Sequence, residues 1–226
     1  MPGHFHFIAD KVDGTTAYFG ALESKHMAGV LRYTVGQEIS CTDGQGLMAT
    51  GILSNIAKNA VEATLKSQIL NERSKILNLF VGVLRQADRM EWLVEKCTEM
   101  GVAGITFLQT KNTQKGKVNM DRMHKKVWAA VKQSHGCFMP KLEIKSLPDA
   151  LKIEGEKYIA YCWDHENKVN PGNMPSQANV FIGPEGDFTQ AEADMAMEAG
   201  SRPLYLGNNI LRTETACLVA CSVHYL

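Results

Sequence analysis

Two glycine-bearing segments near the C-terminus combine residue types that could form a ligand pocket. Residues 181–188 (FIGPEGDF) and 205–216 (YLGNNILRTETA) each follow an apolar run and precede a helical pattern. In open α/β sheets, ligands bind at the carboxyl ends of strands, and glycines there let a ligand approach backbone N–H and C=O groups. Gly183, Gly186 and Gly207 fit this role. A single such glycine is better explained by a tight turn, so the inference depends on the two loops occurring together.

Charged side chains in the same two segments favour a binding or catalytic role over simple turns. Glu185 lies in the first segment, and Arg212 and Glu214 lie where the second segment enters a helix. The helix dipole stabilises a carboxylate at that position and disfavours a cation, which suggests that Arg212 faces a partner molecule. The alternative is an ion pair that joins Arg212 to Glu185 or Glu214.

Several common site types have no support in the sequence. No G-x-G-x-x-G follows a strand, and neither a phosphate-binding G-x-x-x-x-G-K-[ST] loop nor a G-x-S-x-G nucleophile turn occurs. His4 and His6 could share a metal ion, but no third ligand lies nearby in the sequence. We expect them instead to alternate with Phe5 and Phe7 across one strand, and we expect no metal site.

The second half of the chain alternates between strand and helix patterns. Residues 76–84 form a continuous apolar run, as in a central parallel strand, and the alternation continues to the final helix predicted from residue 213 onward. A further strand is predicted at 203–207, and Thr189 with Glu192 predicts a capping box. Residues 87–101 predict a helix that ends at Gly101 and has one apolar stripe: Met90, Leu93, Val94, Cys97 and Met100.

The first 68 residues predict a small β-barrel of short strands and turns. Asp43-Gly44 is a hairpin signal, and one short helix over 23–32 interrupts the strands. Its apolar spacing is carried by Leu22, His26, Val30 and Leu31. The polar stretch 70–75 reads as a linker, so we predict two domains, 1–70 and 73–226, with a boundary near residue 72.

Composition indicates an ordinary globular protein. Lys and Arg number 24, as do Asp and Glu, so no overall positive field would hold the protein on nucleic acid, and any RNA contact must be local. Without a long apolar run or a signal-like start, we expect a cytoplasmic protein. Six cysteines lack a C-x-x-C pair and are expected to be small buried hydrophobes: Cys41, Cys97, Cys137, Cys162, Cys217 and Cys221.

Four ordered motifs resemble those of a known family. FIGPEGDF and LGNNILRTETA closely resemble the paired signature of the RsmE family, bacterial methyltransferases of the knotted SPOUT class. Residues 23–39 are similar to the H-x-x-x-V-L-R segment of the family's amino-terminal PUA-like barrel. Residues 88–105 are similar to its E-K-x-T-E-x-G-V helix, and residues 132–142 to the segment that follows. The resemblance spans nearly the whole chain.

The resemblance implies an α/β fold: a SPOUT trefoil-knotted parallel sheet flanked by helices, with a small PUA-like β-barrel domain at the N-terminus. It implies a homodimer that uses S-adenosyl-L-methionine to methylate N3 of a uridine in 16S ribosomal RNA, with that RNA or the 30S subunit as partner. Carried over by position, the residues that should line the cofactor pocket are Ile182, Gly183, Gly186, Leu206, Gly207, Ile210, Leu211, Thr215 and Ala216.

Catalytic and RNA-binding roles follow as hypotheses. Arg212 should stabilise negative charge on the uracil oxygens as N3 loses its proton, and the base is Glu185, Glu214 or water. His26 and Arg32 are assigned to RNA contact, the alternative being a buried histidine and a surface arginine. Competing functions are methylation of another RNA position, such as one in transfer RNA or a ribose hydroxyl, and a non-catalytic role in ribosome assembly.

This chain departs from the family pattern at two places. Asp187 stands where many relatives have a second glycine. Many relatives also carry an arginine shortly after the Gln133-Ser134 pair, where this chain continues with 135–138 (HGCF). Lys132, His135 or Lys141 could supply a local charge in its place.

Overall fold

The computed structural model describes residues 5–57, 59–113, 117–162 and 168–225. Its contacts divide the chain into two compact units. The first comprises residues 1–73 together with 128–139, and the second comprises 74–127 and 140–226. The predicted domains, 1–70 and 73–226, differ from this division mainly because 128–139 groups with the first unit. His4, which the sequence analysis considered as a metal ligand, lies outside the described residues.

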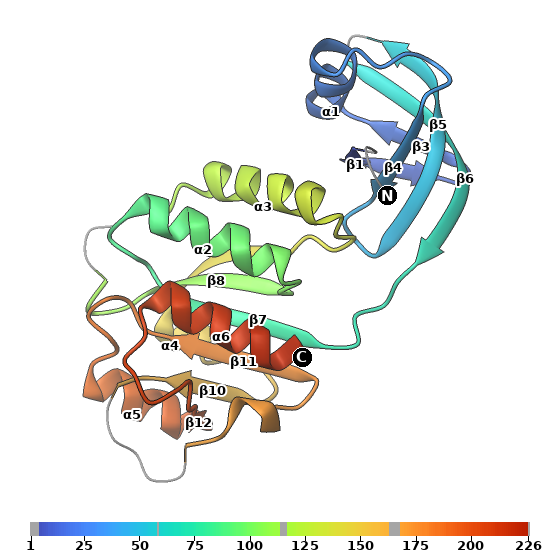
Figure 1. The fold of residues 1–226 in the computed structure, drawn as a ribbon. Coiled ribbons are helices and arrows are strands. Elements are labelled where there is room, and N and C mark those ends of the chain that lie inside the picture. Colours follow the sequence, from blue (N-terminus) through green and yellow to red (C-terminus); the bar gives the residue numbers. More distant parts are fainter. Residues whose placement is uncertain (1–4, 58, 114–116, 163–167, 226) are drawn as a thin grey trace. The chain divides into compact units, whose positions relative to one another are not determined.

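The first unit is built on a strongly curved six-stranded sheet in the order β1-β4-β5-β6-β3-β2 (Figure 1). β1 pairs in parallel with β4, and the other pairs are antiparallel. Its strands are β1 (His6–Ile8), β2 (Lys11–Asp13), β3 (Thr16–Phe19), β4 (Glu38–Thr42), β5 (Leu47–Ala57) and β6 (Ala60–Leu70). Phe7, Phe19 and Leu53 lie in its buried core. The predicted turn at Asp43-Gly44 connects β4 to β5.

The short helix of this unit does not follow the predicted apolar stripe. α1 (Ala21–Lys25) continues into a π-helical turn, η1 (His26–Val30), and Met27 is fully buried. Leu22 is 66% exposed and Val30 is 70% exposed, so the prediction from the 3.6-residue period was wrong. The reason is the wider turn, in which the N–H of Leu31 donates to the carbonyl of His26, five residues back.

The second unit contains a six-stranded, all-parallel sheet in the order β12-β10-β11-β7-β8-β9. The strands are β7 (Ile76–Gly82), β8 (Gly104–Gln109), β9 (Lys141–Ser146), β10 (Lys157–Ala160), β11 (Gln177–Ile182) and β12 (Ser201–Pro203). β7 is central, as its continuous apolar run predicted. β9 was not predicted, because this edge strand is only partly buried and carries alternating charges. The α/β fold class is confirmed, and the trefoil knot stays a prediction.

The last strand lies earlier than predicted. β12 ends at Pro203, and the chain leaves β10 after the N–H of Leu204 donates to the carbonyl of Ile159. Beyond that bond the chain pairs on its other side, where the carbonyl of Pro203 accepts from the N–H of Val169 and the N–H of Tyr205 donates to the carbonyl of Val169. Residues 205–212 form a loop.

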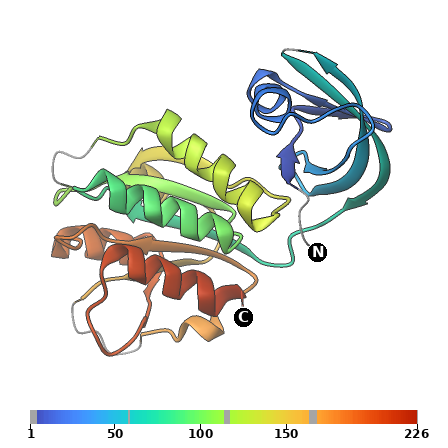
Figure 2. The ribbon, with the colours of Figure 1, turned by 45° about the horizontal axis from the view of Figure 1, so that its top comes forward.

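Helices cover both faces of this sheet (Figures 1 and 2). α2 and α6 pack side by side on one face, and α4 and α5 pack on the other around the stacked rings of Phe80 and Phe181, whose centroids are 4.4 Å apart. The helices are α2 (Ala87–Glu99), α3 (Met120–Ser134), α4 (Leu147–Ala150), α5 (Gln190–Glu198) and α6 (Thr213–Tyr225), with a short 3-10 turn, η2 (Pro171–Asn173).

The strongest local predictions for these helices are confirmed. Met90, Leu93, Val94 and Cys97 of α2 are buried, and Gly101 adopts a positive φ just past the helix end. Thr189 and Glu192 form the predicted capping box at the start of α5.

The cysteines follow the prediction only in part. Cys41, Cys97, Cys217 and Cys221 are buried, but Cys137 is half-buried and Cys162 is exposed. Cys162 was expected inside like the other cysteines, because none belongs to a C-x-x-C pair; it lies instead in the exposed loop just past the end of β10.

Within the described residues, no helix is long and apolar enough to cross a membrane.

Candidate active site

The carboxyl ends of β10, β11 and β12 border a cavity of about 790 Å³ in the second unit. The strands are parallel, so their following loops leave the same edge of the sheet and meet there. The loop after β12, the loop after β11 and the start of α2 all contribute. The lining residues are Gln86, Arg89, Ala160, Tyr161, Cys162, Lys168, Ile182, Gly183, Pro184, Glu185, Asp187, Leu204, Tyr205, Leu206, Gly207, Asn208, Asn209, Ile210, Leu211, Arg212, Thr213 and Ala216.

Most of the predicted cofactor residues line this cavity: Ile182, Gly183, Leu206, Gly207, Ile210, Leu211 and Ala216. Gly186 and Thr215 do not. The carbonyl of Gly186 instead accepts a hydrogen bond from the Asn112 side chain at 2.9 Å, and Thr215 is exposed. Arg212 and Glu185 also line the cavity, whereas Glu214 lies behind it.

The two lining glycines are required for different reasons. Gly207 has a φ of +133°, which only glycine adopts readily, and no atom outside its chain neighbours lies within 4 Å of where a Cβ would be. A Cβ at Gly183 would lie 2.8 Å from the Asp187 carboxylate and 3.0 Å from the Phe188 nitrogen. Gly183 is thus needed so that its own loop can turn tightly, which is the alternative explanation given for a single glycine in the sequence.

Asp187 stands where the family resemblance implies a second glycine, and its backbone adopts a conformation that glycine favours. Its φ is +58°, in the left-handed region that a glycine there would enter freely. The carboxylate accepts from the backbone N–H of Phe188 at 2.7 Å and from that of Cys162 at 2.8 Å. These bonds connect the loop after β11 to the end of β10 and compensate for the unusual backbone.

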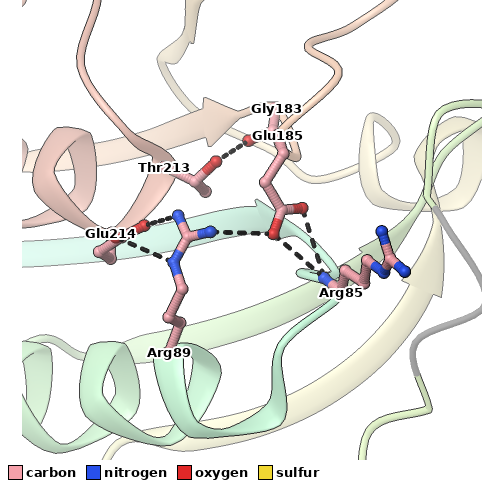
Figure 3. A network of polar contacts seen from close by, with 6 residues as sticks. All are labelled: Arg85, Arg89, Gly183, Glu185, Thr213 and Glu214. Atoms are coloured by element: carbon pink, nitrogen blue, oxygen red, sulfur yellow. Dashed lines mark hydrogen bonds and ion pairs between the residues drawn. The ribbon is translucent and has the colours of Figure 1, made fainter.

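A guanidinium group joins the two predicted carboxylates (Figure 3). Arg89 of α2 binds Glu214 through two bonds, Nε to Oε1 at 3.1 Å and Nη2 to Oε2 at 2.6 Å, and binds Glu185 from Nη1 at 3.2 Å. The backbone N–H of Arg85 also donates to both Glu185 oxygens. Nearby, the Thr213 hydroxyl donates to the carbonyl of Gly183 at 2.9 Å and joins the two loops.

Arg212 does not take part in this network. It is exposed at the cavity, and among the described residues no ion pair joins it to Glu185 or Glu214. Both carboxylates that would neutralise it are bound by Arg89. This arrangement fits an arginine that faces a bound molecule, as the sequence suggested.

The same contacts weaken Glu214 as a general base. Burial acts to raise the pKa of Glu214, but hydrogen bonding to Arg89 and the nearby positive charge outweigh it, so the pKa lies below its ordinary value. A carboxylate with a lowered pKa accepts a proton less readily. Glu185 is bound by the same guanidinium and by the Arg85 N–H, so its oxygens are also largely occupied.

Sequence reasoning missed several lining residues, above all Arg89. It lies on α2 next to the apolar stripe, in the first turn of the helix, where the dipole disfavours a cation. That is the signal that singled out Arg212, so it could also have identified Arg89. Tyr161, Cys162 and Lys168 follow β10 and had no recognisable signal in the sequence.

The two residues assigned to RNA contact belong to the first unit. The His26 side chain is 34% exposed, and its Nδ1 lies 3.2 Å from the Lys132 amine. Arg32 is exposed, with a φ of +55°. Arg32 is therefore a surface residue, as the alternative to RNA contact expected. His26 is only partly buried, so it does not match the buried histidine of that alternative.

Two of the three groups suggested as substitutes for the family's arginine are engaged elsewhere. Lys132 donates to the buried carboxylate of Glu23 at 2.7 Å, and Lys141 pairs with Glu143. The His135 ring packs against His6, with 5.3 Å between the centroids.

Comparison with known proteins agrees with this geometry. A family model described as an RNA methyltransferase domain matches residues 71–225, and one described as an RNA methyltransferase PUA domain matches residues 23–66. Ribosomal RNA small subunit methyltransferase E of Rickettsia conorii is 30% identical over 188 residues, 79% of this chain and 75% of the relative. Its Bacillus subtilis counterpart is 26% identical over 219 residues, 88% of this chain and 86% of the relative.

A solved structure supports the same assignment. Ribosomal RNA small subunit methyltransferase E from Neisseria gonorrhoeae, bound to S-adenosyl methionine, matches with a TM-score of 0.83 and 26% identity. The match covers 97% of this chain and 96% of the other. The two family models, the relatives that match most of the chain and the geometry of the loops agree, and this chain belongs to the ribosomal RNA small subunit methyltransferase E family.

Proposed function

We propose that this protein transfers a methyl group from S-adenosyl-L-methionine to N3 of a uridine in 16S ribosomal RNA. The observation that carries the proposal is the cavity at the carboxyl ends of β10, β11 and β12, lined by both signature loops. Relatives over most of the chain are named as methyltransferases of small-subunit ribosomal RNA. Structures from Neisseria gonorrhoeae and Legionella pneumophila are described with the methyl donor bound.

The residues around the cavity fit this cofactor. Apolar side chains at the end of β11 and in the loop after β12, including Ile182, Leu206 and Leu211, offer contact to a flat adenine ring, and the backbone of Gly207 also lines the cavity. When bound, the cofactor supplies a methyl group activated by its sulfonium charge. The loops would then hold the donor and the base in line for a direct displacement.

Arg212 is the proposed electrostatic catalyst. Uridine N3 carries a proton, and its loss leaves negative charge spread over the two neighbouring oxygens. Among the described residues no carboxylate forms an ion pair with Arg212, so its guanidinium at the cavity edge is available to stabilise that charge. Because Glu185 and Glu214 are bound by Arg89, we infer that water, the third candidate, accepts the proton.

We assign RNA contact in the first unit to the surface near His26 and Arg32. The His26 ring is held edge-on to Phe5 and Phe7, at 6.3 Å and 6.1 Å between centroids, and Phe5 is 50% exposed. The partly exposed rings of Phe5 and His26 suit an unstacked base, and the exposed Arg32 of the same unit suits a phosphate. Ribosomal RNA as substrate also favours the cytoplasm as the place of action.

We also propose that the protein is a homodimer. On α6, Leu218, Val219 and Val223 are only half-buried, and Trp92 of the neighbouring helix α2 is 44% exposed. A second copy would cover these apolar side chains. Light scattering coupled to gel filtration tests this: a mass of two chains supports the proposal, and a mass of one chain overturns it.

The experiment that tests the function is an in vitro assay with purified protein, the methyl donor, and either naked 16S RNA or 30S subunits. We expect 3-methyluridine in digested RNA from at least one substrate. A different methylated nucleoside, or methylation of transfer RNA only, would support the competing enzymatic function. Calorimetric titration with S-adenosylmethionine separates the last alternative, because a non-catalytic assembly factor that lost the site should show no heat of binding.

A further inference from the structure

Arg89 connects three segments that are far apart in the sequence. Its own helix α2 supplies the guanidinium, the loop after β11 supplies Glu185, and the first turn of α6 supplies Glu214 (Figure 3). The backbone N–H of Arg85, which precedes α2, also donates to Glu185 and belongs to the same cluster. We call these four residues, Arg85, Arg89, Glu185 and Glu214, the clamp.

The clamp lies next to the cavity, and its Arg89–Glu214 pair is largely shielded from water, whereas Arg85 and Glu185 are exposed. The side chains of Arg89 and Glu214 are 22% and 11% exposed, and Arg89 and Glu185 line the cavity wall. The fork of Arg89 matches the Glu214 carboxylate with two bonds, the strong and directional form of an ion pair. Its third nitrogen is used for Glu185, so one side chain fixes the position of both loops.

The charge balance of the clamp bears on Arg212. Two carboxylates face one guanidinium within the clamp, and the charge of Arg212 already acts on Glu214. Without Arg89, Glu185 and Glu214 would be left partly desolvated and unpaired, and Arg212 would be the cation in reach. An unpaired carboxylate at this depth is costly, so Arg212 would turn toward it.

We propose that Arg89 is a positioning residue, which binds Glu185 and Glu214 and thereby keeps Arg212 directed at the substrate. The proposal rests on the methyl transfer proposed above. Arg89 acts through other residues and needs no contact with the reacting atoms. It follows that removing Arg89 should lower activity because Glu185 and Glu214 lose their ion-pair partner and attract Arg212.

The test measures kcat, KM for RNA and donor affinity in Arg89→Met, which keeps an unbranched apolar chain in place of the arginine stem and removes the charged guanidinium. We expect kcat to fall by about 100-fold, the size that a small misplacement of a catalytic group produces. Lys96→Met is the matched control, because Lys96 is also an ion-paired residue of α2 but lies outside the cavity. It should keep the wild-type kcat.

The double variant Arg89→Met with Glu214→Gln separates positioning from direct catalysis. If Arg89 restrains the carboxylates, removing the Glu214 charge should restore kcat about 10-fold relative to Arg89→Met, a non-additive result. A double variant no more active than Arg89→Met overturns the proposal, as does wild-type kcat in Arg89→Met.

If Arg89→Met fails to fold, Arg89→Lys replaces it in both measurements, since one ammonium cannot bind both carboxylates in the same way. Absence of methylation by the wild-type protein would instead refute the proposed function.

Discussion

At the scale of single residues, the site depends on which charges are paired. Arg89 is bound to Glu185 and Glu214, whereas among the described residues Arg212 forms an ion pair with neither, although Glu214 is only two positions away in the sequence. The two arginines therefore have different tasks despite their identical chemistry. Arg89 stabilises the protein's own loops, and Arg212 is available to a substrate.

Arg212→Ala should abolish most turnover. Loss of one group that stabilises developing negative charge costs about 100- to 1,000-fold in kcat. The affinity for S-adenosylmethionine should change little, because the apolar and backbone groups of the pocket remain. Single-turnover kinetics and calorimetry measure the two quantities. Arg212→Lys keeps the charge and should retain intermediate activity, and an unchanged kcat in Arg212→Ala would remove this residue from the mechanism.

Glu214 should make stability depend on acid pH. Its folded pKa lies below the unfolded value of 4.5, so the carboxylate stabilises the fold above pH 4.5 and this contribution is lost as pH falls through the folded pKa. We expect Glu214→Gln to lower the free energy of unfolding by about 2 kcal/mol near neutral pH, the size of a charged hydrogen bond. The difference from wild type should shrink in acid.

Urea unfolding of both proteins between about pH 3 and pH 7 measures this difference. Glu198→Gln, at an exposed position of α5, is the control and should match wild type at each pH. A difference between Glu214→Gln and wild type that stays constant with pH would contradict the explanation.

At the scale of elements, the helices are defined by their ends and by what they cover. α2 begins at the cavity and buries one apolar stripe, and α6 begins with Glu214 in the clamp. α5 begins with a complete capping box, and Glu192 also accepts from the backbone N–H of Lys111 at 2.8 Å. α5 follows directly after the loop that leaves β11, so a well-capped start of this helix helps to hold that loop in place.

Thr189→Ala should destabilise the protein by about 1 kcal/mol, the usual cost of a lost helix N-cap. Thermal or urea unfolding measures the change. Glu192→Ala should cost more, because it removes both the reciprocal bond of the box and the acceptor of the Lys111 N–H. Equal stability of Thr189→Ala and wild type would show that the cap is not needed once α5 is packed.

At the scale of the whole molecule, the cofactor should couple to stability. A ligand that binds only the folded protein stabilises it by about 2.7 kcal/mol when present at a hundred times its dissociation constant. S-adenosylmethionine should therefore raise the unfolding midpoint measured by scanning calorimetry, whereas methionine alone should not. No shift at saturating donor would contradict the assigned pocket.

Charge balance predicts how the protein binds RNA. With 24 basic and 24 acidic side chains, the protein has no overall positive field, and binding should depend on a few local contacts. Affinity for the RNA substrate should fall less than about 1,000-fold between about 50 and 200 mM salt, the lower limit for proteins with six to ten phosphate contacts. A steeper loss, measured by filter binding, would indicate a wide basic surface instead.

Local patterns alone predicted a substantial part of the fold. The apolar run of β7, the stripe and terminal glycine of α2 and the capping box of α5 are each determined by neighbouring residues, and each is present. The pattern failed where local rules competed with packing. The π-helical turn carried Met27 inward and exposed Leu22 and Val30, and the last strand ends at Pro203, earlier than its apolar pattern predicted.

The sequence by itself determined two of the segments that form the cavity, since glycine-bearing turns after apolar runs are local patterns, and its motifs identified the family. Only the tertiary structure decided which charges meet. Arg89 and Glu214 are separated by 125 positions, and no local pattern relates them. Their pairing arises because α2 and α6 pack side by side on a parallel sheet, whose strand order brings both helix starts to one edge.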